Sequence, residues 1–196
     1  MKRAFAIVAV LLFITGCMDN EENLKIGTQL LINSDFSRSS SSISPWSSFT
    51  PSGFITGVSK QTFRSGNQSV FIESKDLENT EAAVWSQSYT GQMPSMGARL
   101  RLRAFLKGVD ITSNGLRSNV FVSVRAFPVE DSEGISSGRF FTTQNNVRVN
   151  GTFDWEPIEL VIPFFPREVD RLEVYLVMSS QTSGKVYFDD VTLTVE

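Results

Sequence analysis

The chain has 196 residues, of which 41% are hydrophobic and 20% charged, so the composition indicates neither a disordered polymer nor a polytopic membrane protein. Acidic residues number 21 against 18 basic ones, two of which (Lys2 and Arg3) lie at the extreme N-terminus, and this balance disfavours a nucleic-acid-binding protein. With no histidine and a single cysteine, the sequence excludes histidine-dependent triads, histidine or multi-cysteine zinc sites and an internal disulfide.

Residues 1–16 have the pattern of a secretory signal peptide: two basic residues, an apolar run and small residues before a cleavage site. The apolar run is too short to span a hydrocarbon core of about 30 Å. Residues 14–17, Ile-Thr-Gly-Cys, resemble the lipobox of bacterial lipoproteins. The resemblance implies that Cys17 carries diacylglycerol and further acyl chains such as palmitate, and that residues 17–29 form a lipidated tether. The alternative is an ordinary signal peptide with an incidental cysteine.

The residue after the cysteine bears on the location of the protein. In the lipoproteins that the chain resembles, retention at the inner membrane usually needs aspartate directly after the cysteine, and here that residue is Met18. We therefore expect a lipid anchor in the outer membrane of a bacterial cell envelope. The acidic run that follows resembles some surface-export signals, but a short solvated tether is the interpretation we favour, and the choice between the periplasmic and surface faces stays open.

A serine-dominated segment, residues 33–52, follows the tether and contains two prolines, so regular structure is not expected there. It also contains Phe36, Trp46 and Phe49, and a pure linker seldom has three aromatic residues. We predict a long loop that packs on the domain, not a boundary between two domains.

The rest of the chain has the pattern of β-strands. Hydrophobic and polar residues alternate over residues 98–107, 118–127 and 172–178. Further strands are expected near Leu30 and in residues 54–58, 69–73, 83–89, 155–162 and 185–195. About nine strands separated by Gly, Asn, Ser and Pro clusters, with no amphipathic helix, predict an all-β sandwich formed by residues 30–196.

The last predicted strand contains an irregularity in its alternation. The apolar residues Val186 and Phe188 occupy even-numbered positions, whereas Val191 and the apolar residues after it occupy odd-numbered positions. Because side chains alternate strictly along a strand, the pair Asp189-Asp190 must contain a one-residue slip, most simply a β-bulge.

The C-terminal sequence, residues 184–196, resembles the closing strand of galactose-binding-domain-like jelly rolls, which occur in many bacterial carbohydrate-binding modules. Other pieces resemble the same family in the expected chain order: residues 33–36, Trp46, residues 66–69, 85–87, 100–107 and 151–155. Together they extend from about Leu30 to Glu196. The resemblance implies a jelly-roll β-sandwich, although a fold does not by itself fix a function.

This family often has a calcium ion that links the opening corner to the closing strand. The resemblance places its ligands near Asp35, the turn at Ser65, and Asp189, and calcium prefers six to eight oxygen ligands. However, the family often has glutamate after the phenylalanine of the opening corner, where this chain has Ser37. A structural calcium ion is therefore one possibility, and the alternative is that Asp189 accepts hydrogen bonds from loop amides.

The resemblance also implies a carbohydrate-binding surface in which aromatic rings stack on sugars. Parity places the candidates on one outer sheet face: Arg101, Arg103, Phe105, Phe121, Arg125, Phe127 and Tyr175, with Trp85 nearby. We predict that Arg101, Arg103 and Arg125 lie on neighbouring strands and bind an anionic glycan such as a uronate polymer. The alternative is that the face packs and that its arginines pair with Glu159 and Glu173.

Residues 134–138 match Gly-x-Ser-x-Gly, but the chain has no histidine to act as the base of such a serine, and it has no glycine-rich phosphate loop, so we do not expect an enzyme. Two distant carboxylates could still meet as in a glycosidase. The favoured function is that of a lipid-anchored cell-envelope protein that binds a glycan. The alternative, from a different class, is a structural or assembly lipoprotein whose partner is another envelope protein.

Overall fold

The computed structural model describes residues 23–128 and 139–196, so the predicted signal peptide and Cys17 lie outside the described residues. The described residues form ten strands: β1 (Ser47–Phe49), β2 (Phe54–Ser59), β3 (Ser69–Ser74), β4 (Ala83–Tyr89), β5 (Leu100–Ser113), β6 (Val120–Pro128), β7 (Arg139–Thr142), β8 (Gly151–Ile162), β9 (Val169–Met178) and β10 (Thr182–Val195). No helix in these two ranges is long and apolar enough to cross a membrane.

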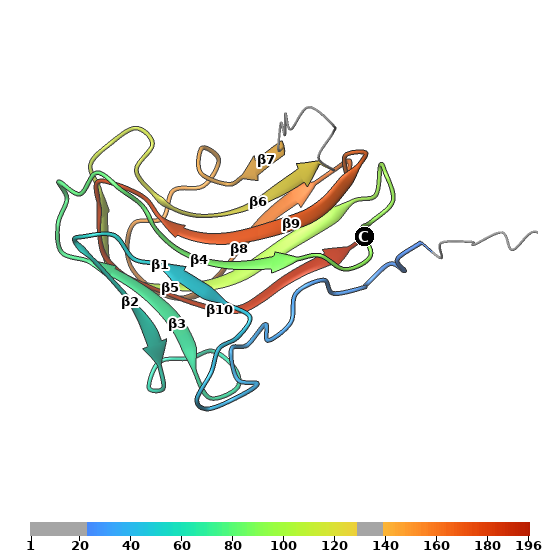
Figure 1. Cartoon of the computed structure of the whole chain (residues 1–196). Coiled ribbons are helices and arrows are strands. Elements are labelled where there is room, and N and C mark those ends of the chain that lie inside the picture. The colour runs from blue at the N-terminus through green and yellow to red at the C-terminus, as the bar shows by residue number, and fades with distance from the viewer. Residues whose placement is uncertain (1–22, 129–138) are drawn as a thin grey trace, which may run out of the picture.

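The strands form two antiparallel five-stranded sheets that pack face to face (Figure 1). We name each sheet after its central strand. The β9 sheet has the order β1-β4-β9-β6-β7, and the β10 sheet has the order β2-β3-β10-β5-β8. In Figure 1 the strands of the β9 sheet bow toward the β10 sheet at their middles, so the outer face of the β9 sheet is concave. The all-β sandwich predicted from alternation is confirmed.

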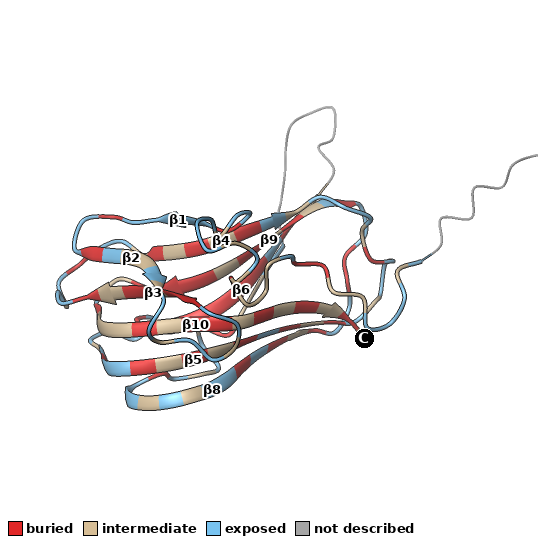
Figure 2. Ribbon diagram, turned by 90° about the horizontal axis from the view of Figure 1, so that it is seen from below, coloured by how far each residue is buried: buried red, intermediate tan, exposed pale blue. Residues whose placement is uncertain are grey.

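The core lies between the sheets and follows the predicted parity. In β5 the four residues Leu100, Leu102, Ala104 and Leu106 are at most 2% exposed, while the residues between them are more exposed. The same alternation appears along the central strands in Figure 2. This burial removes apolar area from water at about 25 cal/mol per Å², which is the main favourable term for the fold.

The strand boundaries differ from the predictions in three places. Strands β1 and β7 were not predicted, because they are short edge strands of three and four residues without a clear hydrophobic alternation. Near Leu30 there is only an isolated bridge between Gln29 and Thr194. The amide of Gly27 already donates to the carbonyl of Val195, so the chain contacts β10 from that residue onward.

The predicted bulge and the predicted packed loop are both present. The register between β10 and β5 shifts between Asp189 and Thr192, and Asp190 has a φ of 49°. In the serine-rich segment, Phe36 is fully buried and Trp46 is 4% exposed, with their ring centroids 5.2 Å apart. The third aromatic residue of the segment, Phe49, is 60% exposed on β1.

Candidate functional site

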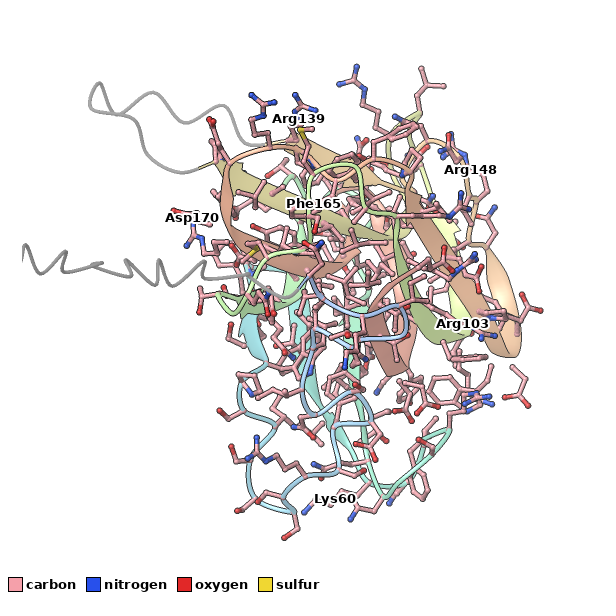
Figure 3. The ribbon with its side chains drawn as sticks, turned by 90° about the vertical axis from the view of Figure 1, so that its right-hand side faces the viewer. Lys60, Arg103, Arg139, Arg148, Phe165 and Asp170 are labelled. Atoms are coloured by element: carbon pink, nitrogen blue, oxygen red, sulfur yellow. The ribbon has the colours of Figure 1, made fainter. Side chains whose placement is uncertain are left out.

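The predicted carbohydrate-binding residues do not lie on one face. Arg101, Arg103 and Phe105 lie on β5 in the β10 sheet, whereas Arg125 on β6 and Tyr175 on β9 lie in the β9 sheet. The prediction that β5 and β6 are neighbours is wrong, because the chain crosses from one sheet to the other between them. In Figure 3, Arg103 and the β9 residue Asp170 lie on opposite sides of the sandwich.

Two of the predicted stacking residues are buried. Trp85 is 5% exposed and belongs to the core, where its indole N–H donates to the backbone carbonyl of Phe71 at 3.0 Å. Phe121 lies on the outer parity of β6 but is only 6% exposed beside Val177. Neither ring is available for stacking on a sugar, so these two predictions are corrected.

The arginines of β5 are neutralised by acids. Arg101 pairs with Glu159 at 2.6 Å and with Glu196, and Arg103 pairs with Glu159 at 3.4 Å. Hydrogen bonds from Arg101 and then Arg99 hold the pKa of Glu196 below its ordinary value. The alternative interpretation, in which these arginines pair across strands, is confirmed for Glu159. Glu173 lies on β9 in the other sheet, opposite Arg125, and it forms no ion pair with an arginine of the described residues.

Phe105 lies between two guanidinium groups, an arrangement that we name the Phe105 stack. The Arg64 guanidinium carbon is 3.5 Å from the ring centroid, and that of Arg103 is 4.7 Å away. Each cation has an acid partner, since Arg64 pairs with Asp190 and Arg103 with Glu159. The Phe105 stack is therefore an internally neutralised surface cluster.

Phe127, on the outer face of the β9 sheet, lies between two other guanidinium groups in what we name the Phe127 stack. The guanidinium carbon of Arg171 is 3.9 Å from the ring centroid, and that of Arg125 is 4.5 Å away. Among residues 23–128 and 139–196, no carboxylate oxygen lies within 4 Å of a nitrogen of either arginine. Sequence reasoning placed both Arg125 and Phe127 on an outer sheet face but missed Arg171.

The Phe127 stack continues into a polar and aromatic surface on the concave side of the β9 sheet. Cross-strand register places Phe140 opposite Arg125, and Tyr175 and Thr142 on either side of Ser123. Phe140 is 53% exposed. We name this surface the concave face; it comprises Ser86, Ser123, Arg125, Phe127, Phe140, Thr142, Arg171, Glu173 and Tyr175.

Two hydroxyl groups on the concave face have distinctive environments. Burial, followed by a hydrogen bond to Glu173, raises the pKa of Tyr175 to about 12, so its phenol stays protonated and can donate. The nearby charges of Arg125 and Arg171 act in the opposite direction on the same pKa. The hydroxyl of Ser123 is buried and has no hydrogen-bond partner among the described residues.

The predicted calcium corner is closed by hydrogen bonds. Asp189 is fully buried and its carboxylate accepts the backbone N–H groups of Arg64 at 2.6 Å, Ser65 at 3.2 Å and Asp190 at 2.8 Å. The hydroxyl of Ser65 donates to Asp190. Burial outweighs these bonds and raises the pKa of Asp189 to about 6. This geometry matches the alternative in which Asp189 binds loop amides.

The opening corner has partners of the same kind. The Ser37 amide donates to the Asp35 carboxylate at 3.2 Å, and the Ser37 hydroxyl accepts the N–H of Asn67 at 2.9 Å. The side-chain amide of the buried Gln68 donates to the carbonyl of Phe36 at 2.6 Å. In the part of the chain that the structure describes, no three acidic or cysteine side chains gather around one point. The residues present do not fit the predicted calcium ion.

Comparison with known proteins gives structural likeness only. No family model and no curated protein sequence matches the chain. The xylan-binding domain CBM22-1 of Paenibacillus barcinonensis Xyn10C is similar to it, with 16% identity over 88% of this chain and 97% of that one and a TM-score of 0.57. TmCBM61, solved in complex with β-1,4-galactotriose, has 18% identity over 86% of this chain and 99% of that one, with a TM-score of 0.51.

Enzymes occur among the similar structures as well. The enzymatically active domain of tailspike protein 4 from bacteriophage CBA120 has 15% identity and a TM-score of 0.57; the match covers 86% of this chain but only 21% of that one. A cyclase from Fischerella sp. TAU has a TM-score of 0.56. At these identities the likeness shows the fold, a jelly-roll sandwich of the kind found in carbohydrate-binding modules.

Proposed function

We propose that the protein is a non-catalytic glycan-binding module and that the concave face of the β9 sheet is its binding surface. The observation that carries the proposal is the combination on this one face of an exposed aromatic ring, Phe140, with two arginines that have no ion-pair partner among the described residues. Aromatic rings stack on the C–H groups of sugars, and hydroxyl, carboxylate and guanidinium groups bind their hydroxyls. The likeness to two carbohydrate-binding modules supports this choice but does not identify the sugar.

The concave shape favours a chain of sugars as the ligand. A curved sheet face can contact several consecutive rings, and the row that contains Ser86, Tyr175, Ser123 and Thr142 runs across the strands. The phenol of Tyr175 and the hydroxyl of Ser123 lie next to each other in this row. The Tyr175 phenol stays protonated and can donate to a ligand hydroxyl, whereas the neighbouring Ser123 hydroxyl is buried.

A glycan array on the purified protein tests the proposal. We expect binding to at least one polysaccharide, and we expect Phe140→Ala to weaken it about three- to tenfold, the value of one aromatic contact. Phe63→Ala is the matched control, since Phe63 is also partly exposed but lies in the turn between β2 and β3 of the other sheet. Absence of binding by a folded protein, together with co-purification of one stoichiometric protein, would favour the assembly lipoprotein instead.

We further propose that the module is held at the envelope by acyl chains on Cys17, on the basis of the lipobox-like residues 14–17. Several acyl chains give stable membrane anchoring, whereas one chain gives only reversible binding. Cys17→Ala is expected to move the protein to the soluble fraction or to leave an unprocessed precursor. Unchanged membrane partitioning of the variant would contradict the anchor without affecting the glycan proposal.

A further inference from the structure

The two arginines of the Phe127 stack are close together and have no ion-pair partner among the described residues. Both guanidinium carbons lie against the same ring, so they are no further apart than the sum of their distances to its centroid, 3.9 Å and 4.5 Å. Arg125 is exposed and Arg171 is half-buried. Like charges this close repel unless an acid or an anionic ligand lies nearby.

The acid that lies opposite this site, Glu173, forms no ion pair with its arginines. Glu173 lies directly opposite Arg125 in the β6–β9 register, yet its carboxylate is not within 4 Å of any Lys or Arg nitrogen of the described residues. Its interaction with the Tyr175 phenol is, after burial, a cause of the raised pKa of that phenol. Neither guanidinium donates a hydrogen bond to another described residue, so the N–H groups of Arg125 and Arg171 are free for a ligand.

The protein neutralises comparable arginines on its other outer face. Arg99, Arg101 and Arg103 follow one another on the outer side of β5 and its approach, and each pairs with Glu159 or Glu196. The chain as a whole is acidic. At the Phe127 stack, by contrast, two arginines without an ion-pair partner among the described residues share one aromatic ring, and they lie on the face that the proposed function assigns to the ligand.

We propose that the ligand of the concave face is an acidic glycan, and that Arg125 and Arg171 bind its carboxylate or sulfate groups. The inference rests on the proposed function, because it names the class of glycan that the same face takes. The planar guanidinium group binds carboxylate and sulfate oxygens through pairs of parallel N–H donors. Phe127 holds both guanidinium groups in place by cation–π contact, and Phe140 next to Arg125 is the ring on which the sugar stacks.

The experiment compares charged polymers with their neutralised counterparts on the full-length protein purified in detergent. Polygalacturonate is paired with its fully methyl-esterified form, and dextran sulfate with dextran. We expect at least one acidic member to bind at least tenfold more tightly than its neutral counterpart, with affinity that falls as salt rises. The pair that shows the preference distinguishes a carboxylate from a sulfate ligand.

Variants assign the preference to the two arginines. Arg125→Gln and Arg171→Gln are each expected to weaken binding of the acidic polymer about ten- to a hundredfold, the value of a charge-assisted contact, and to leave neutral polymers nearly unaffected. Arg103→Gln is the matched control, because it removes a guanidinium beside Phe105 on the other face. Thermal melts of all three variants verify that the fold is intact.

The outcomes separate the two proposals. If glycans bind with no preference for charge, or if the arginine variants keep the preference, the acidic-glycan inference is wrong and the proposed function stands. If no glycan binds, both fail. Poly-L-glutamate is the remaining probe: arginine-dependent binding of this polypeptide as tight as that of polygalacturonate would show general attraction of anions and would overturn the assignment to an acidic sugar.

Discussion

The Phe105 stack and the Phe127 stack contain the same side chains, one phenylalanine between two arginines, but they differ in their charge balance. In the Phe105 stack both guanidinium groups have carboxylate partners, Asp190 and Glu159. In the Phe127 stack neither has one among the described residues. The two clusters lie on opposite outer faces of one sandwich.

The difference lies in the ion pairs that the neighbouring strands provide. Arg103 on β5 faces Glu159 on β8 and pairs with it. Arg125 on β6 faces Phe140 on β7 and Glu173 on β9, and Glu173 forms no ion pair with it. A surface ion pair contributes only about 0–1 kcal/mol, so replacing the acid by an aromatic residue costs the fold little. The face keeps two arginines without an ion-pair partner among the described residues, beside the exposed ring of Phe140. An arginine cluster therefore indicates a binding role only when its cross-strand partners leave it unpaired.

The largest expected effect comes from the turn that supports Arg64 in the Phe105 stack. Gly66 has a φ of 64°, and a Cβ there would lie 2.0 Å from the Ser37 hydroxyl oxygen and 2.9 Å from an Asp35 carboxylate oxygen. Gly66→Ala should lower the free energy of unfolding by about 1–3 kcal/mol for the positive φ and about 1–3 kcal/mol more for the clash.

Gly97→Ala is the matched control for this substitution, because Gly97 has a φ of 84° and a Cβ added there would meet no other atom within 4 Å. Chemical unfolding gives the free energy of unfolding of both variants. The difference between their losses is the contribution of the clash, because the backbone strain is common to both. Glycan binding on the concave face should survive in Gly66→Ala below its lowered melting temperature. Equal destabilisation of the two variants would show that Ser37 and the turn do not form a close contact.

The second prediction uses the buried carboxylate that holds the Arg64 turn. Burial raises the pKa of Asp189 to about 6 from 3.8, so the folded state binds its proton more tightly than the unfolded chain. The stabilisation from that proton is full below pH 4 and is lost as the pH rises through 6, by at most about 3 kcal/mol. Asp189→Asn has no such proton to lose.

The measurement is the difference in unfolding free energy between the parent protein and Asp189→Asn at several pH values from 4 to 7. Other titrating groups are common to both proteins and cancel in the difference. The parent should lose stability relative to the variant as the pH rises through this range. A difference that is constant, or that changes in favour of the parent, would mean that the amide bonds of Arg64 and Ser65 outweigh burial.

The third prediction converts the Phe127 stack into the kind of cluster found around Phe105. Phe140→Glu places a carboxylate opposite Arg125, as Glu159 lies opposite Arg103. Phe140→Gln removes the same ring without adding charge and is the control. We expect the glutamate variant to bind an acidic polymer about tenfold more weakly than the glutamine variant, about 1.4 kcal/mol, with melting temperatures that differ little. Equal affinities would mean that Arg125 does not contact the ligand.

Much of the fold could be predicted because it depends on local alternation. The strict alternation in β5, β6 and β9 and the parity slip at Asp189 were all readable from the residues alone. The short strands β1 and β7 were not, since edge pairing in these segments depends on the neighbouring strand more than on their own composition.

The candidate site was harder to predict because it depends on which strands are neighbours. Parity correctly placed Arg101, Arg103 and Arg125 on outer faces, but it could not assign them to two different sheets. The sequence also could not show that Trp85 belongs to the inner face. Arg171 is the third residue of β9. It belongs to the site only because the strand register places it opposite Phe127 on β6.

The smallest expected effect concerns the calcium ion predicted at the corner near the Phe105 stack. An ion needs several free oxygen ligands, but here the Asp189 carboxylate accepts three backbone amides and Asp190 binds Ser65 and Arg64. We therefore expect a chelator to leave the melting temperature unchanged within about 1 °C. A native-state ion present at a hundred times its Kd would stabilise the fold by about 2.7 kcal/mol, which corresponds to about 5–10 °C for a domain of this size.

Thermal melts with chelator, and with chelator followed by excess calcium, make the measurement. A fall in melting temperature that calcium restores, and that Asp189→Asn abolishes, would show that an ion replaces the hydrogen bonds of this corner.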